Sequence, residues 1–280
     1  MIFLSILLVL ALVQWWGSGA PLQKDGAFYR YLGWLDQQRF SRRPKAHLLM
    51  AVLLPTLVLW VLYAWVVSQV SAILGFLIAV PVLLYSLGRG DFSSQVRAYL
   101  DASERGDSVS AAQHLADLQG VAAEDGDPED WPELHRQALK AIAYGGFERM
   151  FAVIFWFVVL GPAGALLYRL SVLYRQAHAS RAAQRWLWLL EWPAVRLMGL
   201  TWAMAGDFER CFFRCQRDLF NRQQSSAALL YDQMLGALGA QSDQPGSAEV
   251  DSDMIRAGQP LFSRSLLLWV CVLALITLLA

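Results

Sequence analysis

Charged residues, cysteine and histidine are all scarce in this chain of 280 residues. Charged side chains make up 16% and the formal net charge is zero. Nucleic-acid-binding domains usually carry a basic surplus, so nucleic acid is excluded as a partner. Three cysteines are too few for an exported disulfide framework, and reduced thiols are expected. The sequence predicts no metal site, because no metal-ligand spacing is formed by the histidines, which are His47, His114, His135 and His178.

Catalytic motifs are also missing. The chain has no G-x4-G-K-[ST] phosphate loop, no G-x-S-x-G, no H-E-x-x-H and no dinucleotide-binding glycine pattern. The run Gly88-Arg89-Gly90-Asp91 looks like a phosphate-cradling turn, but a turn followed by a helix N-cap accounts for it. The sequence therefore predicts no cofactor and assigns no catalytic residue.

Long apolar runs are what the chain has in abundance. Hydrophobic residues make up 56%, and the mean hydropathy is +0.38. Residues 46–87 form one apolar block, broken only by Ser68 and Gln69. A bilayer core about 30 Å thick takes roughly 20 helical residues, so this block predicts a hairpin of two transmembrane helices. Residues 1–16 predict an uncleaved first helix and 261–280 a final one. The expected surroundings are therefore a lipid bilayer.

The whole chain is predicted to be all-α, a multi-pass membrane protein with about four to five transmembrane helices plus cytoplasmic helical segments. Five consecutive regions are expected. They are an N-terminal membrane region 1–87, a polar helical region 88–150 with an acidic loop over 122–133, a membrane region 151–205, an amphipathic helix and flexible linker 206–260, and a C-terminal transmembrane helix 261–280.

Several membrane topologies are possible for residues 151–205. Basic loops tend to stay in the cytoplasm, which places 17–45 and 88–150 inside and the N-terminus outside. The run Gly161-Pro162-Ala163-Gly164 interrupts the apolar stretch, either as a kink within one span or as a re-entrant break. A second hairpin formed by 151–172 and 186–205 is the alternative, and it is slightly favoured because 151–160 is very apolar.

Three ionisable residues lie inside apolar segments, where such groups are expensive and often functional. They are Arg169, Glu191 and Arg196. Glu191 and Arg196 are five residues apart on a helix and point to different faces, so each needs a partner elsewhere, such as Arg169 or Arg185. Two roles remain open for them: an ion pair that ties two helices together, or a ligand site.

A resemblance to a known family is carried by residues 155–197. The pattern F-W…G-x-x-G…Y-R of the CobD/CbiB membrane family, which contains the cobinamide-phosphate synthase of cobalamin assembly, resembles Phe155-Trp156, Gly161–Gly164 and Tyr168-Arg169. The family's acidic…P-x-R-L stretch is similar to residues 191–197, which contain Glu191 and Arg196. The resemblance implies that Tyr168, Arg169, Glu191 and Arg196 are functional or ligand-binding residues. Three other synthase motifs are absent, from 118–121, 140–149 and 170–173.

The branch without those motifs is the AmpE family, which the chain resembles further in the run from Ala98 to Ser108. AmpE proteins lie in the bacterial inner membrane and are linked to induction of chromosomal β-lactamase, beside an amidase that recycles cell-wall muropeptides. The resemblance implies a non-catalytic regulatory or signalling protein with a muropeptide or protein partner. A divergent amide-forming synthase and a transporter of a small anionic solute are the alternatives. The oligomeric state is left open.

Overall fold

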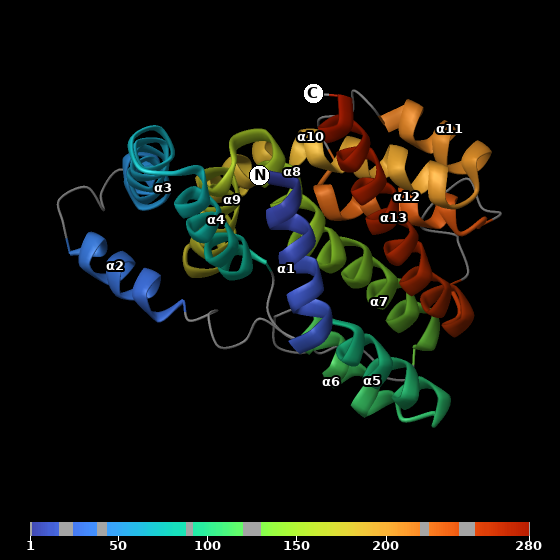
Figure 1. The fold of residues 1–280 in the computed structure, drawn as a ribbon. Coiled ribbons are helices and arrows are strands. Elements are labelled where there is room, and N and C mark those ends of the chain that lie inside the picture. The colour runs from blue at the N-terminus through green and yellow to red at the C-terminus, as the bar shows by residue number, and fades with distance from the viewer. Residues whose placement is uncertain are drawn as a thin grey trace. The chain divides into compact units, whose positions relative to one another are not determined.

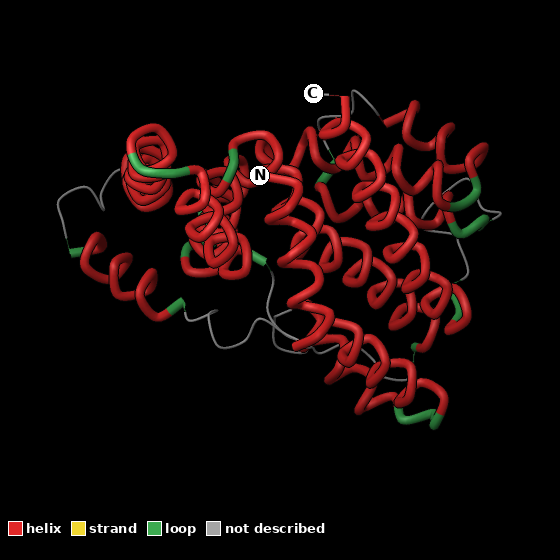
Figure 2. The backbone as a smooth tube through the Cα atoms, viewed as in Figure 1, coloured by secondary structure: helices red, strands yellow, loops and turns green. Residues whose placement is uncertain are grey.

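The computed structural model describes residues 2–16, 25–37, 44–87, 92–119, 130–218, 224–240 and 250–279. Every regular element within these residues is a helix, as Figure 2 shows. The all-α prediction is confirmed. Two expected features, the Gly88–Asp91 turn and most of the acidic loop, lie outside the described residues, which omit 88–91 and 120–129.

The chain divides into two compact units that each combine separate stretches of sequence. Unit 1 contains Met1–Gly90 and Arg149–Glu191, and unit 2 contains Asp91–Glu148 and Trp192–Ala280. The five consecutive regions expected from the sequence are therefore interleaved in the fold. The division falls within a helix, because α10 (Arg181–Ala205) contributes its first part to unit 1 and its second part to unit 2.

Unit 1 is arranged around α9 (Pro162–Ala177), which contacts α3 (Pro44–Gln69), α4 (Ala72–Ser86) and α8 (Ala152–Leu160). Figure 1 labels these helices, and most residues of α9 are buried. The unit also contains α1 (Ile2–Trp16) and α2 (Gly26–Asp36). The predicted hairpin over 46–87 is confirmed, since α3 and α4 pack together and the Ser71 side chain caps α4 by accepting a hydrogen bond from the Ile73 amide.

A glycine ends α8 and reverses the chain into α9. Gly161 has φ of +68° and ψ of −155°, a conformation available essentially only to glycine, and Pro162 then starts α9. A Cβ on Gly164 would lie 2.1 Å from the Trp156 carbonyl oxygen, so α9 packs directly on the backbone of α8. The expectation of one kinked span here is wrong, and the partner of the 152–160 helix is α9 rather than the segment 186–205.

Unit 2 is arranged around α7 (Trp131–Gly146), which contacts α6 (Ser108–Gln119), α12 (Ser226–Ala237) and α13 (Ser252–Leu279). The helices α5 (Phe92–Glu104) and α6 pack as a pair, as do α11 (Phe208–Asp218) and α12. Val96, Tyr99 and Leu100 recur at helical spacing and are buried on α5. These apolar positions form the buried face of this helix in an otherwise polar region.

The boundary expected at residue 150 lies close to a division between the two units, which falls between Glu148 and Arg149. The helix itself is not interrupted there, because α7 continues through a π-helical turn, η2 (Phe147–Phe151), into α8. The linker does not reach residue 259, because α13 begins at Ser252; the Asp251 carboxylate accepts a hydrogen bond from the Met254 amide and caps this helix. The first turns of α13 are polar, so composition alone predicts a linker there. Residues 241–249 lie outside the described part.

Three helical stretches are long and apolar enough to cross a membrane: Lys45–Gln69, Trp131–Leu160 and Ser252–Leu279. Two shorter apolar helices, Ile2–Trp15 and Ile73–Ser86, accompany them, in agreement with the expected number. Within the described residues, the segment 186–205 is not among them. Leu57, Trp60 and Trp65 on α3 are each more than half exposed, and such surfaces are typical of lipid-facing helices. The chain is a membrane protein.

Candidate functional site

Arg169, one of the predicted site residues, is buried in the middle of α9 and does not reach out to solvent. Its Nη2 lies 3.3 Å from the Oδ2 of Asp25, and the side chains are 10% and 4% exposed, respectively. Asp25 is the residue that precedes α2. A buried charge is tolerated when it has an opposite charge beside it, so this pair holds α2 against α9.

Tyr168 and Glu191 meet in the interior of unit 1. The Tyr168 hydroxyl donates to the Glu191 Oε1 at 3.3 Å, and Glu191 is 3% exposed. Two indoles strengthen the same region: Trp186 donates to the Ser171 hydroxyl at 2.9 Å, and Trp156 donates to the Leu190 carbonyl at 3.1 Å. These bonds connect α9 and α8 to the first part of α10, where buried polar groups need partners.

Arg196 is the fourth predicted site residue. It lies on the part of α10 that belongs to unit 2. Its Nη1 donates to the Trp192 carbonyl at 3.3 Å, and its guanidinium lies 4.6 Å from the centroid of the Trp192 ring. The Trp192 ring thus provides Arg196 with a cation–π contact one helical turn away. The structure brings Tyr168, Arg169 and Glu191 into one unit and leaves Arg196 in the other.

A cluster that the sequence did not predict joins Asp36, His47 and His178 in unit 1. The Asp36 Oδ1 lies 3.2 Å from the Nε2 of His47 and 3.2 Å from the Nε2 of His178. Asp36 ends α2, His47 is in the first turn of α3, and His178 follows α9. The histidines are 131 positions apart by number (178 − 47), so only the packing of α3 against α9 reveals the cluster.

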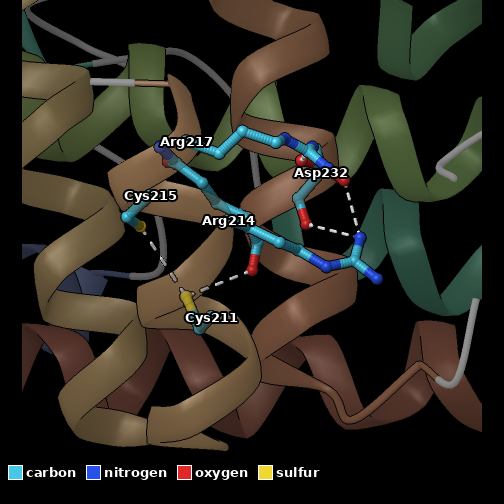
Figure 3. A network of polar contacts seen from close by, with 6 residues as sticks. Cys211, Arg214, Cys215, Arg217 and Asp232 are labelled. Carbon is cyan, nitrogen blue, oxygen red and sulfur yellow. Dashed lines mark hydrogen bonds and ion pairs between the residues drawn. The ribbon is translucent and has the colours of Figure 1, made fainter. Parts of the chain in front are cut away.

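Unit 2 contains a buried ion-pair network between α11 and α12, drawn in Figure 3. The Asp232 side chain is 4% exposed and pairs with two arginines. Its Oδ1 lies 2.6 Å from Nη1 of Arg214, and its Oδ2 lies 2.7 Å from Nη2 of Arg217. Arg214 also donates to the Asp232 carbonyl. The helix expected to be amphipathic thus buries one of its charged residues: the Arg214 side chain is only 8% exposed, because α12 packs against α11.

The two cysteines of α11 lie beside this network. The Sγ atoms of Cys211 and Cys215 are 4.0 Å apart, and Cys211 also approaches the Gln233 carbonyl at 3.4 Å. The hydrogen bond with Cys215, together with burial, raises the pKa of the Cys211 thiol. Cys211 is also fully buried, and buried structural cysteines are generally unreactive.

Comparison with known proteins gives these helices a family. A family model described as "Regulatory signalling modulator protein AmpE" matches residues 1–279. This chain belongs to the AmpE family. The resemblance stated from the motifs over 98–108 and 155–197 is confirmed.

The chain is also similar to two cobalamin biosynthesis proteins CobD. The one from Stutzerimonas stutzeri is 30% identical over 77% of this chain and 73% of its own length. The one from Chromobacterium violaceum is 26% identical over 56% of this chain and 51% of its own length. No solved structure matches the chain. This AmpE-family member is therefore related at a distance to the CobD proteins.

Proposed function

We propose that this chain is a regulatory, non-catalytic protein of the bacterial inner membrane that acts in β-lactamase induction and responds to a muropeptide or protein partner. Family membership over the whole length supports the regulatory role. The long apolar helices support a multi-pass location. The absence of recognisable catalytic motifs from the sequence is consistent with the proposal.

The observation that carries the proposal is how the conspicuous polar residues of unit 1 are used. Arg169 is held by Asp25, and Glu191 accepts from Tyr168, in each case within the protein interior. Such pairs fix the relative positions of α2, α9 and α10. A regulator needs helices held in one arrangement that a partner can shift, whereas a synthase needs polar groups open to its substrate.

The test is induction of chromosomal β-lactamase in the native host. Deleting the gene should change the β-lactamase activity that a muropeptide-releasing inducer produces, and the intact chain should restore it. The variant Arg169→Met should restore it less well, because the buried Asp25 carboxylate loses an opposite charge. The matched control is Arg264→Met, with the amount of each variant in the membrane measured by immunoblot. Unchanged induction after deletion would contradict the proposal.

A CobD-like synthase is the second candidate, favoured by 30% identity to a cobalamin biosynthesis protein over most of the chain. It predicts that the chain supports cobalamin-dependent growth of a strain lacking cobinamide-phosphate synthase. Glu191→Gln and Arg196→Met should then abolish that growth. If the chain restores growth of this strain, the enzymatic proposal replaces the regulatory one. If the strain carrying the chain does not grow, the second candidate is removed.

A further inference from the structure

The cluster of Asp36, His47 and His178 has the composition and spacing of a metal site. One ligand atom from each residue lies within 4.8 Å of the other two. Zinc bonds of about 2.0–2.2 Å in a tetrahedron place neighbouring ligand atoms about 3.3 Å apart. Both nitrogen-to-oxygen distances in the cluster are 3.2 Å, close to this spacing, and the two histidine nitrogens lie within 4.8 Å of each other, so they would move toward each other when a zinc-sized ion binds.

Asp36 faces both imidazoles with one carboxylate oxygen: His178 Nε2 is within hydrogen-bond distance of Oδ1, and a protonated His47 would form an ion pair with it. The Nε2 of His47 is buried and has no hydrogen-bond partner among the described residues, although it lies 3.2 Å from this oxygen. Its Nδ1 lies 2.9 Å from the Tyr174 hydroxyl. When Nδ1 carries the proton and donates to this hydroxyl, the Nε2 lone pair faces Asp36. A histidine that binds a metal is usually oriented by such a bond from its other nitrogen.

His178 is also held in place. The ring of Tyr174 stacks on His178, with centroids 4.8 Å apart and an interplanar angle of 15°. Exposure of the side chains falls from 45% at Asp36 through 29% at His178 to 4% at His47. An ion can therefore enter from the Asp36 side while the buried His47 anchors it. Three protein ligands leave one coordination position for water or another ligand.

We propose that Asp36, His47 and His178 form a binding site for one divalent transition-metal ion of the zinc class. Two imidazoles and one carboxylate suit zinc or its neighbours rather than Mg²⁺ or Ca²⁺, which prefer all-oxygen sites. The three ligands come from the end of α2, the start of α3 and the residue after α9, so a bound ion fastens α2 to the core of unit 1. The site stands independently of the regulatory proposal.

The experiment uses the full chain, purified in detergent without a histidine tag and stripped with a chelator. Titration with Zn²⁺ alone should saturate at one ion per chain and raise the thermal unfolding temperature. Co²⁺ should bind competitively, with visible absorption bands typical of a four-coordinate N/O site. Failure of the wild-type chain to bind either ion would overturn the proposal.

Variants locate the ion. Asp36→Ala and His178→Ala change partly exposed side chains, so they should fold as judged by size-exclusion chromatography, yet lose binding over the range in which the wild type saturates. His47→Ala should do the same. Tyr174→Phe keeps every ligand but removes the bond that orients His47, and it should weaken binding about 10- to 100-fold.

The control variant is His114→Ala, which removes a histidine that lies on α6 in the other unit. It should bind Zn²⁺ like the wild type. Wild-type affinity in both Asp36→Ala and His178→Ala, with the same stoichiometry, would place the ion elsewhere and refute the site.

Discussion

At the scale of single residues, Arg214 and Arg217 share the carboxylate of Asp232 but differ in their surroundings. The Arg214 side chain is 8% exposed, whereas that of Arg217 is 52% exposed. Removing one member of a buried pair leaves an uncompensated charge in the interior, whereas an exposed ion pair contributes little. Two arginines that look alike in the sequence thus have different energetic roles.

Arg214→Met should therefore destabilise the protein, but by less than the cost of a fully unpaired buried charge, about 3–5 kcal/mol, because Arg217 still pairs with Asp232. Arg217→Met, the matched control on the same helix, should cost no more than about 1 kcal/mol. Thermal unfolding of the full chain in detergent, followed by tryptophan fluorescence, measures both. Equal shifts of the unfolding temperature for the two variants would contradict the assignment of Arg214 as the buried partner.

The sequence predicts only part of what the buried polar residues do. The need of Arg169 and Glu191 for partners was predictable, because charge inside an apolar segment is costly. Their partners were not: Asp25 lies 144 positions from Arg169, and Tyr168 had been singled out only through the family resemblance. Which distant side chains meet depends on helix packing, which no local pattern encodes.

At the scale of helices, Gly161 and Gly164 determine the connection between α8 and α9. Gly161 supplies a backbone conformation that side chains disfavour, and Gly164 lets α9 approach the backbone of α8. The sequence identified the Gly-Pro run as a break. Composition does not show whether the Gly-Pro run bends one helix or separates two, because both structures are compatible with the same residues.

Gly164→Ala should destabilise the protein by about 1–3 kcal/mol, because the added methyl group overlaps the Trp156 carbonyl oxygen. Gly33→Ala on α2 is the control: nothing lies within 4 Å of its Cβ, and alanine favours helix by about 1 kcal/mol. The unfolding temperature of each full-length variant should fall for the first and stay level or rise for the second. A fall of similar size in both would rule out the proposed close approach.

At the scale of the whole molecule, exposed apolar residues can face either lipid or water, and the properties of each helix indicate which. Leu57 on α3 is 61% exposed, and Val109 on α6 is 58% exposed. Lys45–Gln69 has the length and hydropathy of a membrane span, whereas α6 is a short, more polar helix. Although the two residues are similarly exposed, we therefore expect Leu57 to contact lipid and Val109 to contact water.

Leu57→Lys should lower the yield of membrane-integrated, monodisperse protein, since a lysine near the middle of a span costs about 2.5–3.5 kcal/mol to insert. Val109→Lys should leave that yield unchanged. Detergent extraction of isolated membranes followed by size-exclusion chromatography measures both. If α3 faced water instead, Leu57→Lys would raise the amount of protein soluble without detergent.

Local composition and periodicity determined by themselves that the chain is helical, that it enters a membrane and that residues 46–87 form a hairpin, because these properties depend on neighbours a few residues apart. The tertiary structure alone decided the division into interleaved units, the reversal at Gly161 and the meeting of Asp36 with His47 and His178. These features arise when helices distant in sequence pack side by side, and the free energy of that packing is distributed over many residues along the chain.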